Sequence, residues 1–258
     1  MEAKGRYTYG DSDMAAERLE LVARMFEPPT RSLLERAVQA RPELATDLGC
    51  GPGHTTRLIH GTLRPSRTVG LEGSERFVQL AAAGAPDGVE FLRHDVRVTP
   101  FPVGPADVIF ARLLVAHLAD AAEVVARWVS QLAPGGVLLM VELEALEPGE
   151  AALDDYMEQV AKPVVAAQGA RLFAGPWLHD MPDPAGAERL IDEVAVVSPE
   201  AWVSAKICAM NVEVLTDRGE IEPRPEILEA LGMIADGSKP DAFPAVWSLR
   251  QIALRRST

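Results

Sequence analysis

An acid and three alternating glycines stand together at the end of a short apolar segment. Residues 45–48 read Ala-Thr-Asp-Leu, and Gly49, Gly51 and Gly53 follow them. Glycines at this spacing let the chain turn sharply and let a ligand lie against bare backbone, where any Cβ atom would collide. Apolar residues then recur at helical spacing, and the free N–H groups at the start of a helix face such a ligand. The pattern predicts a binding turn for a nucleotide-like ligand between a strand and a helix.

A second acid follows at a distance that suits a nucleotide. Glu72 comes 23 residues after Gly49, at the end of another short apolar run. In nucleotide-binding α/β folds an acid at about this distance accepts hydrogen bonds from the ribose hydroxyls, and a solvated acid at a helix N-terminus is the alternative. The dinucleotide fingerprint Gly-x-Gly-x-x-Gly is absent, because His54 and Thr56 stand where its last glycine would be. An NAD or FAD site is therefore disfavoured.

These motifs resemble those of class I S-adenosylmethionine-dependent methyltransferases, of the small-molecule, natural-product tailoring type. The family's first motif is acid-x-Gly-x-Gly-x-Gly, and the segment that begins at Asp47 matches it at every position. Later signatures recur in the family's order, including a Pro-Gly-Gly turn at 134–136 before a wholly apolar strand. The resemblance implies S-adenosylmethionine as the cofactor. The cofactor-binding residues that it implies are Tyr7, Asp47, Gly49, Cys50, Gly51, Gly53, Glu72, Gly73, Asp95, Val96, Arg112 and Leu113.

The resemblance also assigns parts of the cofactor to some of these residues. Glu72 is implied to bind the ribose, and Asp95 with the backbone N–H of Val96 is implied to bind the adenine. The opening segment is similar to the N-terminal lid of many such enzymes, with Tyr7 and Arg18 as contacts for the methionine end of the cofactor. For these two residues an exposed aromatic ring and a solvated helix charge are the alternatives.

Methyl transfer requires the protein mainly to align the acceptor atom with the methyl group of the cofactor. A sulfonium methyl group is already electrophilic, so the site must hold the acceptor atom in line and exclude water. A base is needed only where the acceptor must lose a proton. His117, after the fourth strand, and His179, in the expected cap, are the candidate catalytic bases, and a hydrogen-bonded structural role is the alternative for each. No cysteines or histidines have the spacing of a metal site, and we expect no metal.

The fold class that we expect is α/β, a doubly wound Rossmann-like sheet of seven strands with the last strand antiparallel. Two helices, at 12–26 and 30–40, are predicted before the first strand. One methyltransferase domain covers the chain, and its expected parts are an N-terminal helical lid at 1–42, a cofactor-binding core at 43–143, and cap insertions over the acceptor pocket at 144–190 and 199–240.

Composition and charge limit the classes of partner that this protein is expected to bind. The net charge of −13 opposes binding to nucleic acid backbones. No apolar run approaches the roughly 18 residues of a membrane span, and the N-terminus lacks an apolar signal region, so we expect a cytoplasmic protein without a membrane or nucleic acid partner. Large side chains of the cap favour a small, largely apolar acceptor, namely Phe173, Trp177, Met181 and Trp202. The composition resembles that of enzymes of secondary metabolism such as antibiotic biosynthesis.

Two other functions fit the same motifs. One is a protein of this fold that uses bound S-adenosylmethionine for a cyclisation or rearrangement without methyl transfer. The other is a binding protein that senses the cofactor. The sequence leaves open whether an O, N or C atom is methylated and whether the chain forms a homodimer.

Overall fold

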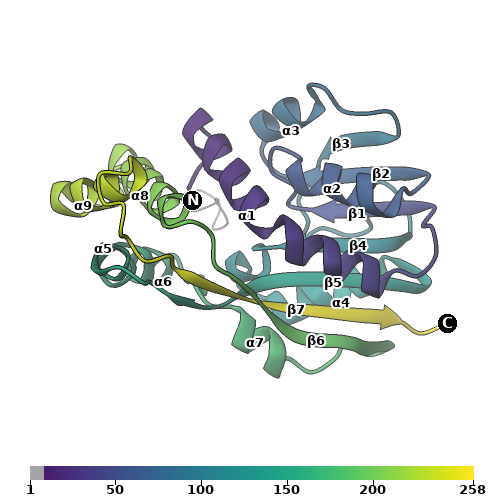
Figure 1. Ribbon diagram of the computed structural model, residues 1–258. Helices are drawn as coiled ribbons and strands as arrows, with labels where there is room; N and C mark the ends of the chain where they lie inside the picture. Colours follow the sequence, from purple (N-terminus) through teal and green to yellow (C-terminus); the bar gives the residue numbers. More distant parts are fainter. Residues whose placement is uncertain (1–8) are drawn as a thin grey trace.

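The computed structural model describes residues 9–258, and its centre is a single mixed sheet (Figure 1). The strand order is β3-β2-β1-β4-β5-β7-β6. The first five strands run parallel, and β7 is antiparallel to both β5 and β6. The predicted seven-stranded sheet with its antiparallel last strand is confirmed. The strands are β1 (Leu44–Leu48), β2 (Arg67–Glu72), β3 (Val89–Arg93), β4 (Ala106–Arg112), β5 (Leu132–Glu147), β6 (Ala187–Val197) and β7 (Val246–Arg256).

Helices cover both faces of the sheet (Figure 1). The early part of the chain forms α1 (Asp13–Ala37), α2 (His54–Leu63), α3 (Glu75–Ala82), the 3-10 helix η1 (Val115–His117) and α4 (Ala121–Ser130). The later part forms α5 (Ala151–Tyr156), the π-helix η2 (Met157–Ala161), α6 (Lys162–Ala167), α7 (Gly175–Asp180), α8 (Ala201–Asp217) and α9 (Pro225–Ala235). None of the helices within residues 9–258 has the length and apolar character to cross a bilayer.

The middle strands are apolar because both of their faces are buried. Each residue of the run Val108–Ala111 in β4 is at most 1% exposed. Odd and even positions of the strands face two separate cores. The first core lies under α1, α2 and the cap helices, and the second core lies under α4 and α7. Since β1 to β4 are parallel, their carboxyl ends meet at one edge of the sheet, where a ligand is expected in such folds.

The start of the chain differs from the prediction of two helices. α1 is one helix that runs through Pro28 and Pro29. Each proline removes a backbone donor, and directly after them the Thr30 hydroxyl donates to the Phe26 carbonyl at 2.7 Å. Phe26 also packs edge to face on Trp247 of β7, with ring centroids 6.0 Å apart. Packing along the sheet therefore keeps the helix continuous, where sequence rules place a break.

The Pro-Gly-Gly segment also differs from expectation, and the expected cap includes a short helix that packs on the sheet. The Pro-Gly-Gly stretch predicted as a turn lies inside β5 as a bulge, since Ala106 pairs with Leu132 while Val108 pairs with Val137. Within the expected cap segment at 144–190, residues 175–180 form α7, and the proline near its start suits the first turn of a helix.

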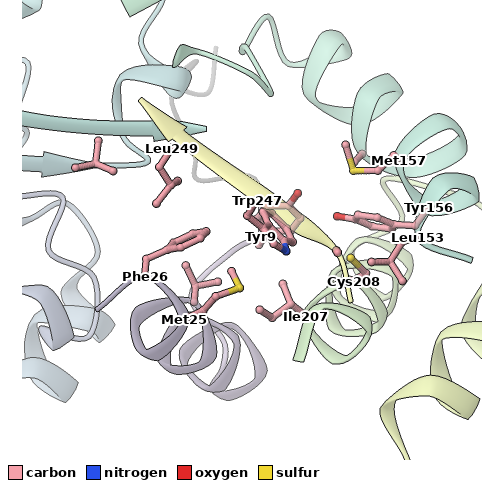
Figure 2. Packing of buried hydrophobic residues seen from close by; sticks show 14 of the residues in the cluster. Tyr9, Met25, Phe26, Leu153, Tyr156, Met157, Ile207, Cys208, Trp247 and Leu249 are labelled. Carbon is pink, nitrogen blue, oxygen red and sulfur yellow. The ribbon is translucent and has the colours of Figure 1, made fainter. Parts of the chain in front are cut away.

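The expected cap segments contain α5 to α9, and α5, α6, α8 and α9 lie together at one end of the sheet (Figure 1). They share the first core with α1 and β7. Figure 2 shows Tyr156 and Met157 of the cap, Ile207 and Cys208 of α8, and Met25 of α1 around this shared core. The cap is therefore continuous with the core of the sheet. α7 lies apart from the other cap helices, because it packs on the second core.

Candidate active site

The turn after β1 has the backbone that only glycine adopts readily. Gly49, Gly51 and Gly53 have φ angles of 61°, 53° and 83°, a region that L side chains rarely occupy. A Cβ atom at Gly53 would stand 2.6 Å from the Phe91 ring, and one at Gly49 would stand 2.9 Å from Leu114. The turn then opens α2, with Gly53 as its N-cap. Bare backbone at a helix N-terminus fits the cofactor that the motif predicts.

Glu72 ends β2 beside this turn. Its Oε2 accepts a hydrogen bond from the Gly51 N–H at 2.9 Å, and its Oε1 accepts one from the Ser74 N–H at 2.8 Å. The carboxylate is thereby held between the turn and the start of α3. Gly73 has open space at its Cβ position. Cys50 is buried within the turn, and burial raises the pKa of its thiol well above the ordinary value, which makes it unreactive.

A buried network of charged and hydroxyl groups supports the turn from β1 and β4. Asp47 is 2% exposed and accepts a hydrogen bond from Thr56 at 2.6 Å. Burial raises the pKa of Asp47 to about 7. Arg112, at the end of β4, donates to Thr55 at 2.7 Å and to Thr30 at 3.2 Å. Burial lowers its pKa to about 10. The network ties α1 and α2 to the two central strands.

The predicted adenine residues lie in the loop after β3, next to the end of β2. The residue before Asp95 donates its N–H to the Glu72 carbonyl at 2.9 Å. The Asp95 carboxylate is hydrogen-bonded to the Arg97 guanidinium, which lowers the pKa of Asp95. The Val96 carbonyl accepts from the Trp128 indole at 2.8 Å. The structure thus brings the ribose and adenine candidates to one edge, while Tyr7 lies outside the described residues.

The loop after β4 separates this edge from the cap. Leu113 has a positive φ of 53°, which is rare for a leucine. Leu114 lies against Gly49 of the binding turn. His117 ends η1, and burial with the nearby charge of Arg18 lowers its pKa to about 4. The imidazole is therefore neutral at pH 7.

Beyond the loop lies a group of buried polar side chains that we call the Arg18 cluster: Tyr9, Arg18, Tyr156 and Asn211. The Arg18 guanidinium carbon stands 4.2 Å from the centroid of the Tyr9 ring, and its Nε donates to Asn211 Oδ1. Asn211 donates in turn to the Tyr156 hydroxyl at 2.6 Å. Figure 2 shows Tyr156 pointing from the cap toward Tyr9. All four side chains are at most 9% exposed.

Sequence reasoning found only Arg18 of this cluster, and it placed that residue at the cofactor. The one available signal was Asn211, a polar residue within a helix whose neighbours Met210 and Val212 are buried and apolar. Such a residue predicts a buried hydrogen bond. Its partners are 193 and 55 residues away, so they could not be named from the sequence.

The second candidate base lies elsewhere. His179 of α7 is bonded to Asp192 of β6 at 2.8 Å, and its side chain is 54% exposed. The strands β5 and β7 separate β6 from β4. The structure therefore does not bring His179 together with His117.

The large side chains expected in the acceptor pocket are spread over three places. Trp177 and Met181 pack on the second core with α4. Phe173 packs on the first core, and Trp202 is 39% exposed. Within residues 9–258 no three His, Cys, Asp or Glu side chains are placed to hold a metal ion.

Comparison with known proteins agrees with the fold and the turn. A family described as the methyltransferase domain matches residues 46–140. Trans-aconitate 2-methyltransferase of Acidovorax sp. (strain JS42) is 37% identical over 245 residues, covering 87% of this chain and 93% of that protein. The protein of the same name from Methylobacterium radiotolerans is 30% identical over 244 residues, covering 85% and 90%.

A solved structure shows the same fold at low identity. The plantazolicin methyltransferase BpumL, in complex with S-adenosylhomocysteine, has a TM-score of 0.53 and 13% identity, over 99% of this chain and 95% of that one. The fold defines a Rossmann-like enzyme with a glycine-rich turn after its first strand. The chain belongs to the class I S-adenosylmethionine-dependent methyltransferases. It is an enzyme, and S-adenosylmethionine is its cofactor.

Proposed function

We propose that the enzyme methylates a carboxylate oxygen of a small organic acid that carries more than one carboxylate, and that the product is a methyl ester. The observation that carries the proposal is the Arg18 cluster. A guanidinium matches a carboxylate in geometry and charge, and it does so best where water is excluded. The two relatives support this acceptor class, because both are named for trans-aconitate, a tricarboxylic acid.

The cofactor residues take the roles that the motifs imply. In this proposal Glu72 binds the ribose, and Asp95 with Val96 binds the adenine. The Asp95 pair with Arg97 is partly exposed and so costs little to rearrange. The methionine end lies on the glycine turn near Asp47, Arg112 and Leu113, and Tyr7 of the N-terminal lid keeps its implied role as a contact for this end. When bound, the cofactor supplies an electrophilic methyl group.

The acceptor end of the site needs no strong base. A carboxylate is already ionised at neutral pH, so it can attack the methyl carbon without losing a proton. This suits His117, whose pKa of about 4 makes it a weak base. We assign His117 to contact with the acceptor, and His179 has no part in the reaction. Arg18 holds a second carboxylate of the acceptor.

The negative net charge of the protein does not exclude an anionic acceptor. Surface charges are screened over about 8–10 Å in physiological salt, whereas a guanidinium that is 9% exposed acts at short range. The expectation of an apolar acceptor rested on four large side chains of the cap. Trp177 and Met181 pack on the second core, Phe173 packs on the first core, and Trp202 is exposed. This removes the support that these side chains gave to a largely apolar acceptor.

A product assay tests the proposal. The enzyme is incubated with S-adenosylmethionine and, in separate reactions, trans-aconitate, a dicarboxylate, a monocarboxylate and a phenol. We expect S-adenosylhomocysteine to form in proportion to a product one methylene heavier, with the polycarboxylates preferred, and alkali to return the free acid. Methylation of the phenol alone, or a product that resists alkali, would overturn the proposal. Conversion of an acceptor without S-adenosylhomocysteine would favour the rearrangement alternative.

A further inference from the structure

Glu142 of β5 is a buried carboxylate whose partners are backbone N–H groups. It is 1% exposed. Its Oε1 accepts from the Leu114 N–H at 2.8 Å and from the Val115 N–H at 2.7 Å, and the carboxylate receives a third bond from the Ala116 N–H. One side chain therefore holds three successive residues of the loop after β4. Hydrogen bonds to an ionised acceptor are about twice as strong as neutral ones.

The first part of this loop lies on the cofactor side. Leu114 packs against Gly49 of the binding turn, and its Cδ1 is 2.9 Å from the position that a Cβ at Gly49 would take. Leu113, just before it, has the strained φ of 53°. Strained backbone persists only when surrounding contacts fix it. The Glu142 bonds begin at the next residue, so they supply that constraint.

The second part of the loop lies on the acceptor side. It contains His117, whose pKa responds to Arg18 of the cluster. The Ala116 carbonyl accepts from the Arg171 N–H at 3.0 Å, which ties the loop to the cap. The loop thus touches the binding turn, the acceptor side and the cap. Movement of it would shift the two reactants relative to each other.

The charged groups around Glu142 are committed to other partners. Arg250 of β7, in register with Glu142, bonds to Glu144 and Asp192. Arg112 of β4 bonds to two threonines, and His179 of α7 bonds to Asp192. His117, on the loop itself, is neutral at pH 7 because its pKa is about 4.

Burial raises the pKa of Glu142 to about 7, and the three N–H bonds oppose this rise. A raised pKa means that the contribution of this group to stability is full below the unfolded pKa of about 4.5 and is lost as the pH rises through 7. Ionised Glu142 therefore destabilises the fold. A group that costs stability when ionised points to a functional reason for its presence.

We infer that Glu142 is a positioning residue for methyl transfer: its ionised carboxylate fixes the loop 113–117 between the cofactor turn and the acceptor. The inference rests on the proposed function only in placing the acceptor beside His117. A misplacement of about 1 Å in a reacting geometry can cost roughly 100-fold in rate. Loss of the carboxylate should therefore affect turnover more than cofactor binding.

Glu142→Gln tests the inference, with Glu144→Gln as its matched control. Glu144 lies two residues further on the same strand, and its carboxylate binds Arg250 instead of the loop. In the complex with S-adenosylhomocysteine, we expect amide hydrogen exchange at residues 114–116 to rise at least about tenfold in Glu142→Gln. Glu144→Gln should leave this exchange unchanged. These readouts need no acceptor, so they stand even if the proposed acceptor class fails.

Kinetics supply the second readout. We expect Glu142→Gln to lower kcat at pH 8 by about 10- to 100-fold, with the Kd of S-adenosylmethionine within about threefold of the wild type. Its Tm at pH 8 should not fall, because a buried charge is removed. The wild-type kcat should rise through pH 7, and this limb should be absent in Glu142→Gln and present in Glu144→Gln.

Three results would overturn the inference: unchanged loop exchange, a pH limb that persists in Glu142→Gln, or a parallel fall of kcat, cofactor affinity and Tm. If Glu142→Gln does not fold, the wild type serves instead. Protection of amides 114–116, relative to amides of β4, should then increase between pH 6 and pH 8. Equal protection at both pH values would contradict the role.

Discussion

The two ends of the active site are built in different ways. At the cofactor end, the glycine turn and Glu72 lie within one short stretch of chain. The shape of this end is set mainly by backbone conformation and backbone N–H groups. At the acceptor end, the Arg18 cluster joins side chains from α1, α5 and α8. The first is specified by local sequence, whereas the second exists only after the chain has folded. We therefore propose that recognition of the shared cofactor depends on residues close together in the sequence, and recognition of the acceptor on residues far apart in it.

The difference also has an energetic side. Glu72 binds the backbone N–H groups of Gly51 and Ser74, so these bonds do not depend on a particular partner side chain. Each bond of the Arg18 cluster joins two particular side chains inside an apolar core, where an unsatisfied polar group costs about 1–3 kcal/mol. Changes at the cofactor end should therefore act on cofactor affinity, and changes in the cluster on the acceptor.

The largest effect is expected at Gly51. Valine at a φ of 53° is strained, and its side chain would occupy the face of the turn toward Leu19, which lies 3.5 Å from the Cβ position. Gly51→Val should weaken S-adenosylmethionine binding at least about 100-fold by calorimetry. Gly61→Ala, in α2 with open space around it, is the control that should bind normally. Wild-type affinity in Gly51→Val would break the assignment of this turn to the cofactor.

A smaller effect is expected at Glu72. Glu72→Ala removes the proposed acceptor for the ribose hydroxyls, and each charge-assisted bond contributes about 1.5–3 kcal/mol, so affinity should fall about 10- to 100-fold. The sharper measurement compares S-adenosylmethionine with its 2′-deoxy analogue. The wild type should prefer the natural cofactor, and Glu72→Ala should not. Glu75→Ala, at an exposed residue nearby, is the control, and a preference that survives in Glu72→Ala would remove Glu72 from the ribose.

Asp47 should make cofactor affinity depend on pH. Its pKa of about 7 means that the carboxylate ionises as the pH rises from 6 to 7.5, and the ionised form attracts the ammonium group of the cofactor's methionine end. We expect a three- to tenfold gain in affinity over this range, which is about 1 kcal/mol. Asp47→Asn should show a flat profile in calorimetry. An equal pH dependence in both proteins would place the titrating group elsewhere.

The smallest effect is expected at His117. If the acceptor is a carboxylate, His117→Ala should lower kcat by less than about tenfold and leave the pH profile of turnover unchanged. Loss of a general base would instead cost roughly 10²- to 10⁴-fold. The depressed pKa of about 4 stabilises the fold above pH 6.5, and this contribution is lost as the pH falls through 4. The variant should therefore be less acid-sensitive in thermal melts.

The sequence predicted what depends on near neighbours. The glycine spacing, the acid at Glu72 and the apolar runs each predicted their elements, because turn geometry and strand burial leave local patterns. α1 was wrongly divided, because Thr30 and the packing of Phe26 on Trp247 outweigh two prolines. His179 was predicted to lie in the cap over the acceptor, but its helix α7 packs on the second core.

The acceptor end could not be predicted for the same physical reason. Arg18 and Asn211 are 193 residues apart, and their bond depends on how α1 meets α8. No local sequence pattern around Arg18 or Asn211 indicates that the two residues are in contact. The role of Glu142 could not be predicted either, since its partners are N–H groups that a sequence does not distinguish.

One measurement tests most directly the claim that the two ends act separately. Trans-aconitate is titrated calorimetrically into the S-adenosylhomocysteine complex of the wild type, of Arg18→Met, and of Arg24→Met, whose exposed arginine on α1 pairs with Glu20. Removing a charged partner of a buried pair costs on the order of 2–5 kcal/mol. Arg18→Met should therefore bind the acid at least about 30-fold more weakly and S-adenosylhomocysteine within threefold of normal, while Arg24→Met binds both normally. Wild-type affinity of Arg18→Met for the acid, or an equal loss of both ligands, would contradict the account.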